Sequence, residues 1–76
     1  MILPRRLLAH RVVHMGQLYG LSIVDITGDD VVVEAFSVET AGTAFVDGTV
    51  YVLAEGSTPE NPVWTQRSAD VRLWVK

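Results

Sequence analysis

The fold is decided by residues 18–40, which read LYGLSIVDIT, then GDD, then VVVEAFSVET. In both runs apolar side chains occupy odd and even positions, so an extended chain would carry them on both faces. Gly28-Asp29-Asp30 between the runs is typical of a tight turn, because glycine adopts positive φ and aspartate hydrogen-bonds its own backbone. The stretch predicts two antiparallel strands whose faces are both partly buried.

Working outward, the C-terminal half of the chain also favours strands. Asp47-Gly48 separates residues 43–46 from residues 49–54, and this dipeptide is a strong signal for a two-residue hairpin turn. Residues 55–62 contain two prolines and predict the longest loop. The last six residues alternate between apolar side chains and cationic or aromatic ones, which predicts a final strand with one buried face.

Residues 5–15 fit two kinds of secondary structure. We expect a strand, because the chain is rich in β-branched residues: Val, Ile and Thr number 22 against 13 for Ala and Leu. A helix over 5–15 is the alternative, because Leu8, Val12 and Met15 are helically spaced between Pro4 and Gly16.

Together these elements predict an all-β fold in which residues 1–76 form one small domain. We expect an antiparallel meander of about five strands, arranged as a sandwich or a partly open barrel; a helix at 5–15 would make the class α+β. A chain this short buries only about 60% of the surface its unfolded form exposes. It has no cysteine to form disulfides, so association with a second copy would supply useful additional burial.

Charges are unevenly placed along the chain. Residues 1–16 hold three arginines and no acid, residues 17–66 hold eight acids and no lysine or arginine, and residues 67–76 hold three cations and one acid. Favourable ion pairs must therefore join the ends to the middle, unless every charge is separately solvated. The acidic middle argues against a nucleic-acid partner. No apolar run is long enough for a membrane span or a signal peptide, so we expect a cytoplasmic protein without a membrane partner.

The residues that could carry chemistry are few. His10 and His14 are weak candidates for metal ligands, four residues apart and expected to project to the same side of a strand or a helix. Two imidazoles are fewer ligands than a zinc site uses, and Arg11 beside them would repel a cation. The sequence contains no nucleophile elbow and no glycine-rich phosphate loop. We therefore predict no metal, no other cofactor and no enzymatic activity for the isolated chain.

The interaction site is predicted on the final strand, where Trp74 lies between two cations on the face opposite the apolar residues. Tryptophan and arginine are enriched at interface hot spots, so this face would bind a partner if it is exposed. The alternative is that Trp74 covers a second core layer, and Trp64 could similarly be a lid over the core. The candidate interaction residues are Arg72, Trp74, Lys76 and Trp64.

The order of elements over residues 9–48 resembles the small β segment that begins many metal-dependent amidohydrolases. The matching features are the Val12-Val13 strand, the strand over 22–26, the turn and valine strand that follow, and a short strand ending in Asp47-Gly48. The H-x-H metal motif of that superfamily is not in this sequence, so the resemblance implies a fold and no site residues.

From these observations we expect a non-catalytic protein-interaction module that self-associates as a homodimer. The contact would use a terminal strand and the face formed by Arg72, Trp74 and Lys76. The alternative function, implied by the resemblance, is an accessory or regulatory β domain that docks on a separate catalytic protein.

Overall fold

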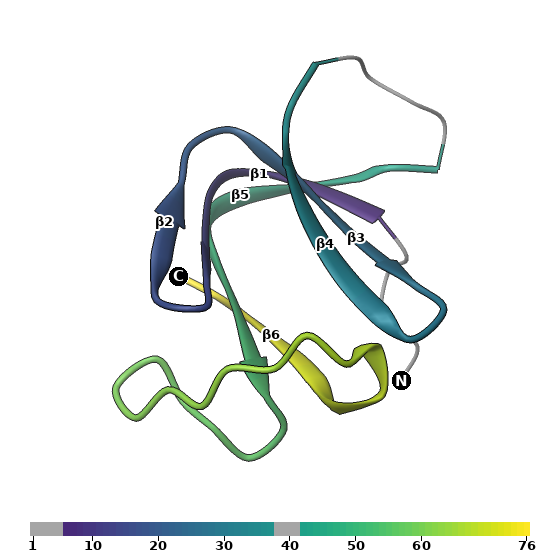
Figure 1. The fold of residues 1–76 in the computed structure, drawn as a ribbon. Coiled ribbons are helices and arrows are strands. Elements are labelled where there is room, and N and C mark those ends of the chain that lie inside the picture. The colour runs from purple at the N-terminus through teal and green to yellow at the C-terminus, as the bar shows by residue number, and fades with distance from the viewer. Residues whose placement is uncertain (1–5, 38–41) are drawn as a thin grey trace.

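The computed structural model describes residues 6–37 and 42–76, and Figure 1 shows their fold. Within these ranges the chain forms six strands and one short 3₁₀ helix, η1 (Ser68–Asp70). The strands are β1 (Arg6–His14), β2 (Gln17–Tyr19), β3 (Ser22–Thr27), β4 (Asp30–Ala35), β5 (Ala44–Ala54) and β6 (Val71–Val75). They make one mixed sheet in the order β4-β3-β1-β5-β6, with β2 pairing the second half of β1. The all-β prediction is confirmed. Of the two predicted arrangements, the sandwich is replaced by a single sheet, and this sheet does not close into a barrel, which is compatible with the partly open barrel.

Residues 5–15 fitted either a strand or a helix, and the structure shows strand β1 over Arg6–His14. The helix given as the alternative over 5–15 is therefore wrong for the described residues 6–15. β1 is central in the sheet: it pairs antiparallel with β2 and β3 on one side and parallel with β5 on the other. Its β-branched pair Val12-Val13 favours this extended conformation. Hydrogen bonding to three neighbours outweighs a helical spacing, since a helix here would leave β2 without a partner and would remove one partner each from β3 and β5.

The parallel pairing of β1 with β5 corrects two predictions. The sheet is not a wholly antiparallel meander, and Asp47-Gly48 does not form a hairpin turn. Residues 44–54 form one continuous strand, because both halves of β5 pair with β1: Leu7 lies opposite Ala44 and His14 opposite Val52. Two collinear halves cannot also fold back on each other.

Asp47-Gly48 instead lies at an irregularity in the ladder. Between the pairs Ala9↔Val46 and Arg11↔Thr49 the register shifts, with two residues of β5 opposite one of β1. Gly48 has φ +107°, a backbone conformation that other residues rarely adopt. The glycine that a turn would need is thus used by a bulge.

The burial of β1 changes phase at the same place. Leu7 and Ala9 are buried before the shift, and Val12 and His14 are buried after it. β2 and β3 separate opposite this point, since β3 pairs with residues 6–9 of β1 and β2 with residues 12–14. The single strand predicted over 18–27 is therefore two strands.

The predicted turn at residues 28–30 is confirmed. Thr27 and Asp30 pair across a two-residue connection in which Gly28 has φ +51°. The strand predicted over 31–40 is observed from Asp30 to Ala35, and residues 38–41 lie outside the described part of the chain. The loop predicted at 55–62 is also confirmed, and the irregular segment continues to residue 67.

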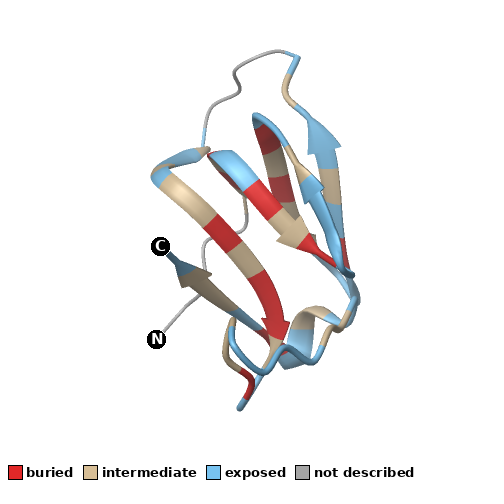
Figure 2. Cartoon of the chain, turned by 90° about the vertical axis from the view of Figure 1, so that its left-hand side faces the viewer, coloured by how far each residue is buried: buried red, intermediate tan, exposed pale blue. Residues whose placement is uncertain are grey.

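The core lies on one face of the sheet and consists mainly of valine. Figure 2 shows the buried residues alternating with more exposed ones along the strands. The core cluster contains Leu7, Ala9, Val12, Val24, Val31, Val50, Val52 and Val71. Burying one such side chain contributes about 1.5–3 kcal/mol, and the strand alternation leaves the opposite face of the sheet free of this core.

The edge strand β4 is fastened at its beginning to the segment that precedes η1. The Val31 N–H donates to the Gln66 carbonyl at 2.9 Å, and the Ser68 N–H donates to the Asp29 carbonyl at 3.2 Å. The Ser68 hydroxyl also donates to the Gly28 carbonyl at 2.6 Å. In Figure 1 this places the β3–β4 turn next to the chain leading into β6, so the sheet curls toward closure at one end.

Candidate functional site

The predicted interaction residues Arg72 and Trp74 do lie together on β6. The Arg72 guanidinium carbon lies 4.8 Å from the centroid of the Trp74 ring, which is a cation–π geometry. Trp74 is half-buried, and its indole N–H is buried without an acceptor among the described residues. The ring therefore neither projects freely into solvent nor fills a fully covered second core.

Lys76 follows β6 and pairs with the loop. Its ammonium lies 2.7 Å from a carboxylate oxygen of Glu60. The hydrogen bond from Lys76 holds the pKa of Glu60 below its usual value, and the same bond raises the pKa of Lys76. Both groups are exposed, so the pair orients the end of the chain more than it stabilises the fold.

Trp64 lies in the irregular segment between β5 and β6 and is half-buried. Its two neighbours are held by the sheet: the Ala54 N–H donates to the Val63 carbonyl at 2.6 Å, and His14 Nε2 lies 3.2 Å from the Thr65 carbonyl. In the described part of the chain no hydrogen bond, ion pair or ring contact joins Trp64 to β6. The structure thus brings three of the four predicted residues to one end of the chain and places Trp64 on a separate segment.

The backbone of β6 supplies a feature that side-chain patterns could not show. Thr49 and Lys76 exchange two hydrogen bonds, and the Glu55 N–H donates to the Asp70 carbonyl. Because hydrogen-bonded and non-hydrogen-bonded pairs alternate in an antiparallel ladder, Arg72 and Trp74 also direct their N–H and C=O groups toward β5. The intervening residues of β6 direct theirs outward.

The outer edge of β6 is consequently open. Within residues 6–37 and 42–76, β6 pairs with β5 alone. Leu73 and Val75 present both backbone groups at this edge, and Val71 presents its carbonyl, since its N–H bonds to Ser68. Val75 is 52% exposed. Figure 2 shows β6 at one margin of the sheet, with the C-terminus at its tip.

A second surface, which the sequence did not single out as a site, lies on the face of the sheet opposite the core. Leu8 lies opposite both Phe45 and Ile23 in the ladder, so the three side chains form a row across β5, β1 and β3. Val32 on β4 has the same orientation, and Phe45 is 59% exposed. We call Leu8, Ile23, Val32 and Phe45 the outer patch. The sequence did contain a signal for this patch, because the apolar residues in 18–40 were predicted to lie on both faces of their strands.

The two histidines, named as weak metal candidates, do not lie on the same side. The phase change in β1 between them puts His10 on the exposed side and leaves His14 5% exposed. His10 contacts the ring of Phe45 edge-on at 5.3 Å and lies 3.7 Å from an Asp47 carboxylate oxygen. Across residues 6–37 and 42–76, no three His, Asp or Glu side chains gather in a way that could hold a metal ion.

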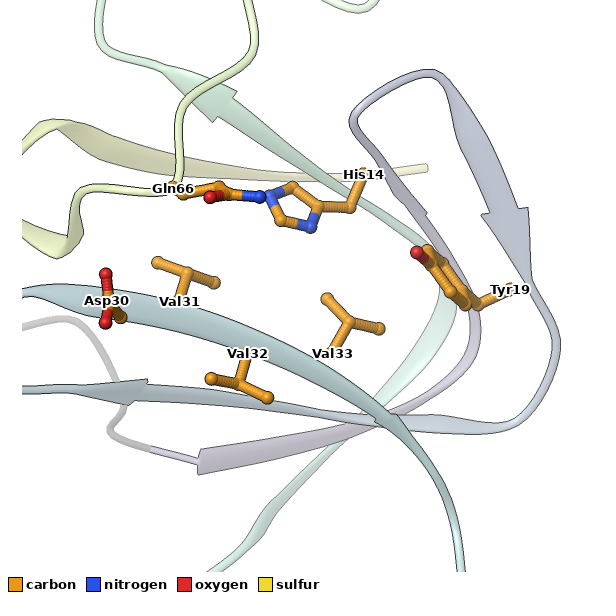
Figure 3. A pocket seen from close by; sticks show the side chains of 7 residues that line it. All are labelled: His14, Tyr19, Asp30, Val31, Val32, Val33 and Gln66. Atoms are coloured by element: carbon orange, nitrogen blue, oxygen red, sulfur yellow. The ribbon is translucent and has the colours of Figure 1, made fainter.

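His14 forms part of an open cavity of about 380 Å³, which Figure 3 shows from close by. The cavity is lined by His14, Tyr19, Asp30, Val31, Val32, Val33 and Gln66. Val31 and Val33 face the His14 ring from β4, and the Gln66 side chain lies beside that ring. Because a carbonyl oxygen can only accept, Nε2 is the donor in its hydrogen bond to Thr65. The cavity therefore has an apolar floor and a rim of separate polar groups, with no nucleophile and base in hydrogen-bond contact.

Two ion pairs follow the predicted pattern of ends joined to the middle, whereas a third, Arg67–Asp70 at 3.7 Å, lies within the C-terminal end. Arg6 pairs with Asp25 at 2.7 Å, and Lys76 pairs with Glu60 at 2.7 Å. The alternative, in which every charge is separately solvated, is therefore wrong for these four side chains. The Arg6–Asp25 pair lies beside the outer patch, since Asp25 is opposite Val32 in the ladder.

Comparison with protein-family models, with curated proteins and with solved structures finds no match for this chain. Among the residues that the structure describes, no helix is long and apolar enough to cross a membrane.

Proposed function

We propose that this chain is a cytoplasmic, non-catalytic protein-interaction module that self-associates through the open edge of β6. The observation that carries the proposal is this edge, where Leu73 and Val75 direct backbone donors and acceptors away from the sheet, without partners among residues 6–37 and 42–76. An open strand edge pairs readily with another extended strand, because each added strand satisfies a row of backbone groups at once. The neighbouring Arg72 and Trp74 are the side-chain types that dominate binding energy at interfaces.

The open edge differs from an edge that is protected against pairing. β6 contains no proline, and the guanidinium of its one charged side chain, Arg72, lies over the Trp74 ring. Val75 at the outer end is apolar and exposed. Pairing of β6 with a second copy would cover this side chain and add the burial that a short chain without disulfides lacks.

A proline at position 75 tests the proposal. The Val75 N–H points outward, so Val75→Pro removes an edge donor and leaves the bonds to β5 intact. Val75→Thr is the matched control, because it keeps both the N–H and the β-branched shape. We expect sedimentation at micromolar to millimolar concentrations to show dimers for the native chain and for Val75→Thr, and monomers for Val75→Pro. A native chain that stays monomeric over this range would refute self-association.

The outer patch favours the second candidate function, an accessory domain that docks on a separate catalytic protein. Phe45 is the most exposed member of this patch, and its ring contacts the His10 ring edge-on. Apolar patches on a soluble protein commonly mark contact surfaces. A pull-down with three baits tests this function: the native chain, Val75→Pro and Phe45→Ser. If the outer patch binds an enzyme, the native chain and Val75→Pro capture it and Phe45→Ser does not. Loss with Val75→Pro and retention with Phe45→Ser would exclude the outer patch.

A further inference from the structure

We infer that two copies of this chain pair β6 with β6 in antiparallel orientation about a two-fold axis through Leu73, so that Arg72 of each copy faces Trp74 of the other. This inference rests on the self-association proposed above and specifies its register. Two observations support this inference: the open edge of β6 and the positions of the charged side chains along that strand.

Backbone geometry limits the choice of register. Only the residues whose backbone groups point outward can exchange hydrogen bonds with a second β6, and these are Val71, Leu73 and Val75. Leu73 is the middle residue of the strand Val71–Val75, so an axis at Leu73 overlaps all five residues of both copies. Shifting the axis by one residue to either side leaves part of each strand without a partner.

The available donors and acceptors fit this register. The two Leu73 residues exchange two bonds across the axis, each N–H donating to the other copy's carbonyl. The Val75 N–H of each copy donates to the Val71 carbonyl of the other. The Val71 N–H is already bonded to the Ser68 carbonyl and is not required. The outward N–H groups of Leu73 and Val75 are then both satisfied.

The side chains on the face of β6 opposite the core distinguish this register from registers shifted by one residue. With the axis at Leu73, Arg72 lies directly opposite the partner's Trp74 in a close, non-hydrogen-bonded pair. An axis at Trp74 would place Arg72 opposite the partner's Lys76, and an axis at Arg72 would place the two arginines opposite each other. Like charges directly opposite are unfavourable, so both shifted registers are selected against.

The remaining positions agree with the same register. Each Lys76 comes opposite the partner's Asp70, which brings opposite charges to the two ends of the paired strands. On the other side of the strand, Val75 comes opposite the partner's Val71. Val71 is 7% exposed and belongs to the core, whereas Val75 is 52% exposed. The pairing therefore covers the apolar side chain that the single copy leaves open. Two five-residue strands make a small interface, so we expect a weak, concentration-dependent dimer.

Single cysteines test the register, since the chain has no cysteine of its own. In a hydrogen-bonded antiparallel pair the Cα atoms are about 5.5 Å apart, which suits a disulfide. Under mild oxidation we expect Leu73→Cys to form a covalent dimer, and Trp74→Cys and Val75→Cys to remain uncrosslinked. Phe45→Cys is the control for random collision, because Phe45 is exposed and lies on β5.

The outcomes separate the register from self-association itself. Crosslinking of Trp74→Cys in place of Leu73→Cys would place the axis at Trp74 and overturn the inference while leaving self-association intact. A dimer in sedimentation with no crosslinking at any of the three β6 positions would mean that another surface is used, and it would also overturn the inference. A monomer at all concentrations would refute the proposed function.

A charge reversal gives an independent test that does not disturb a half-buried residue. Arg72→Glu removes two Arg72–Trp74 contacts per dimer, so we expect the dimer dissociation constant to rise about tenfold. With the axis at Trp74, the same variant would place the introduced carboxylate opposite the partner's Lys76 and tighten the dimer. Arg11→Glu is the control, because Arg11 is exposed and lies two strands away from the edge. Tighter association of Arg72→Glu would overturn the inference.

Discussion

The two edge strands of the sheet, β4 and β6, differ in the hydrogen bonds that their outward backbone groups make. At β4 the only outward N–H near the turn, that of Val31, is taken up by the Gln66 carbonyl, and Ser68 binds the turn itself through two further bonds. At β6 the outward groups of Leu73 and Val75 have no strand beside them in the described residues. The chain thus covers the beginning of the β4 edge from within, whereas along β6 both Leu73 and Val75 keep their outward backbone groups available in the described residues.

The largest expected effect is at the residue that anchors the end of β6. A Cβ at Gly48 would lie 2.6 Å from the Lys76 carbonyl oxygen, and φ at this position is +107°. We expect Gly48→Ala to lower the free energy of unfolding by about 2–4 kcal/mol, through backbone strain and displacement of the strand end. Urea denaturation measures this. Gly20→Ala is the control, because a Cβ there meets nothing within 4 Å. Equal stability of the two variants would mean that β6 is not held at Gly48.

A smaller effect is expected at the turn that precedes β4. Ser68→Ala removes the 2.6 Å bond to the Gly28 carbonyl and should lower the free energy of unfolding by about 1 kcal/mol. Amide hydrogen exchange sharpens the comparison: we expect Val31 to exchange faster in this variant and Leu73 to be unchanged.

In the native chain, the Val75 amide should become protected only as the protein concentration rises. Protection of Val75 at the lowest concentration would contradict the open edge.

Trp74→Phe should change the stability of the single subunit by less than about 1 kcal/mol. The lost ring contact is offset by removal of a buried indole N–H that has no acceptor in the described structure. Trp64→Phe is the matched comparison, because Trp64 is also half-buried and its N–H is not among the orphaned groups. Urea denaturation at low protein concentration should show a larger loss for Trp64→Phe. The reverse order would mean that Trp74 has an acceptor.

The smallest effect concerns the pair at the end of the chain. The pKa of Glu60 is held below its usual value by Lys76, so the pair's contribution is present above the unfolded pKa of Glu60 and is lost as the pH falls through the lowered value. The raised pKa of Lys76 means that this contribution is lost again only at strongly alkaline pH. We expect NMR titration to show the pKa of Glu60 returning toward its usual value in Lys76→Met. An unchanged Glu60 pKa would mean that the pair does not form in solution.

Asp47-Gly48 shows where sequence-based prediction reached its limit. The dipeptide correctly marked a position that needs a positive φ, but a two-residue turn and a bulge in a continuous strand both satisfy that need. Which one forms depends on whether β1 lies alongside both halves of β5. That pairing joins residues nearly forty positions apart in the sequence and has no local signature.

The histidines teach the same lesson for the candidate site. Their spacing predicted that both side chains lie on one side of the strand. The burial phase of β1 changes where its register with β5 shifts, and this change puts them on opposite sides. The shared side of Arg72 and Trp74 was predictable because both lie on a single regular strand, where alternation is enough to place them. The open edge was not recognisable, since it depends on which strands the rest of the chain brings beside β6.

The sequence by itself determined the all-β class, the turn at residues 28–30, the long loop after β5 and the joining of the charged ends to the acidic middle. These features follow from side-chain branching, turn chemistry and the sign of the charges, all of which act locally or at long range without regard to register. Only the tertiary structure decided the parallel pairing of β1 with β5, the bulge at Gly48 and the unequal edges. Backbone hydrogen bonds are the same for every residue type except proline, so the order of strands in a sheet is set by how all of them pack together.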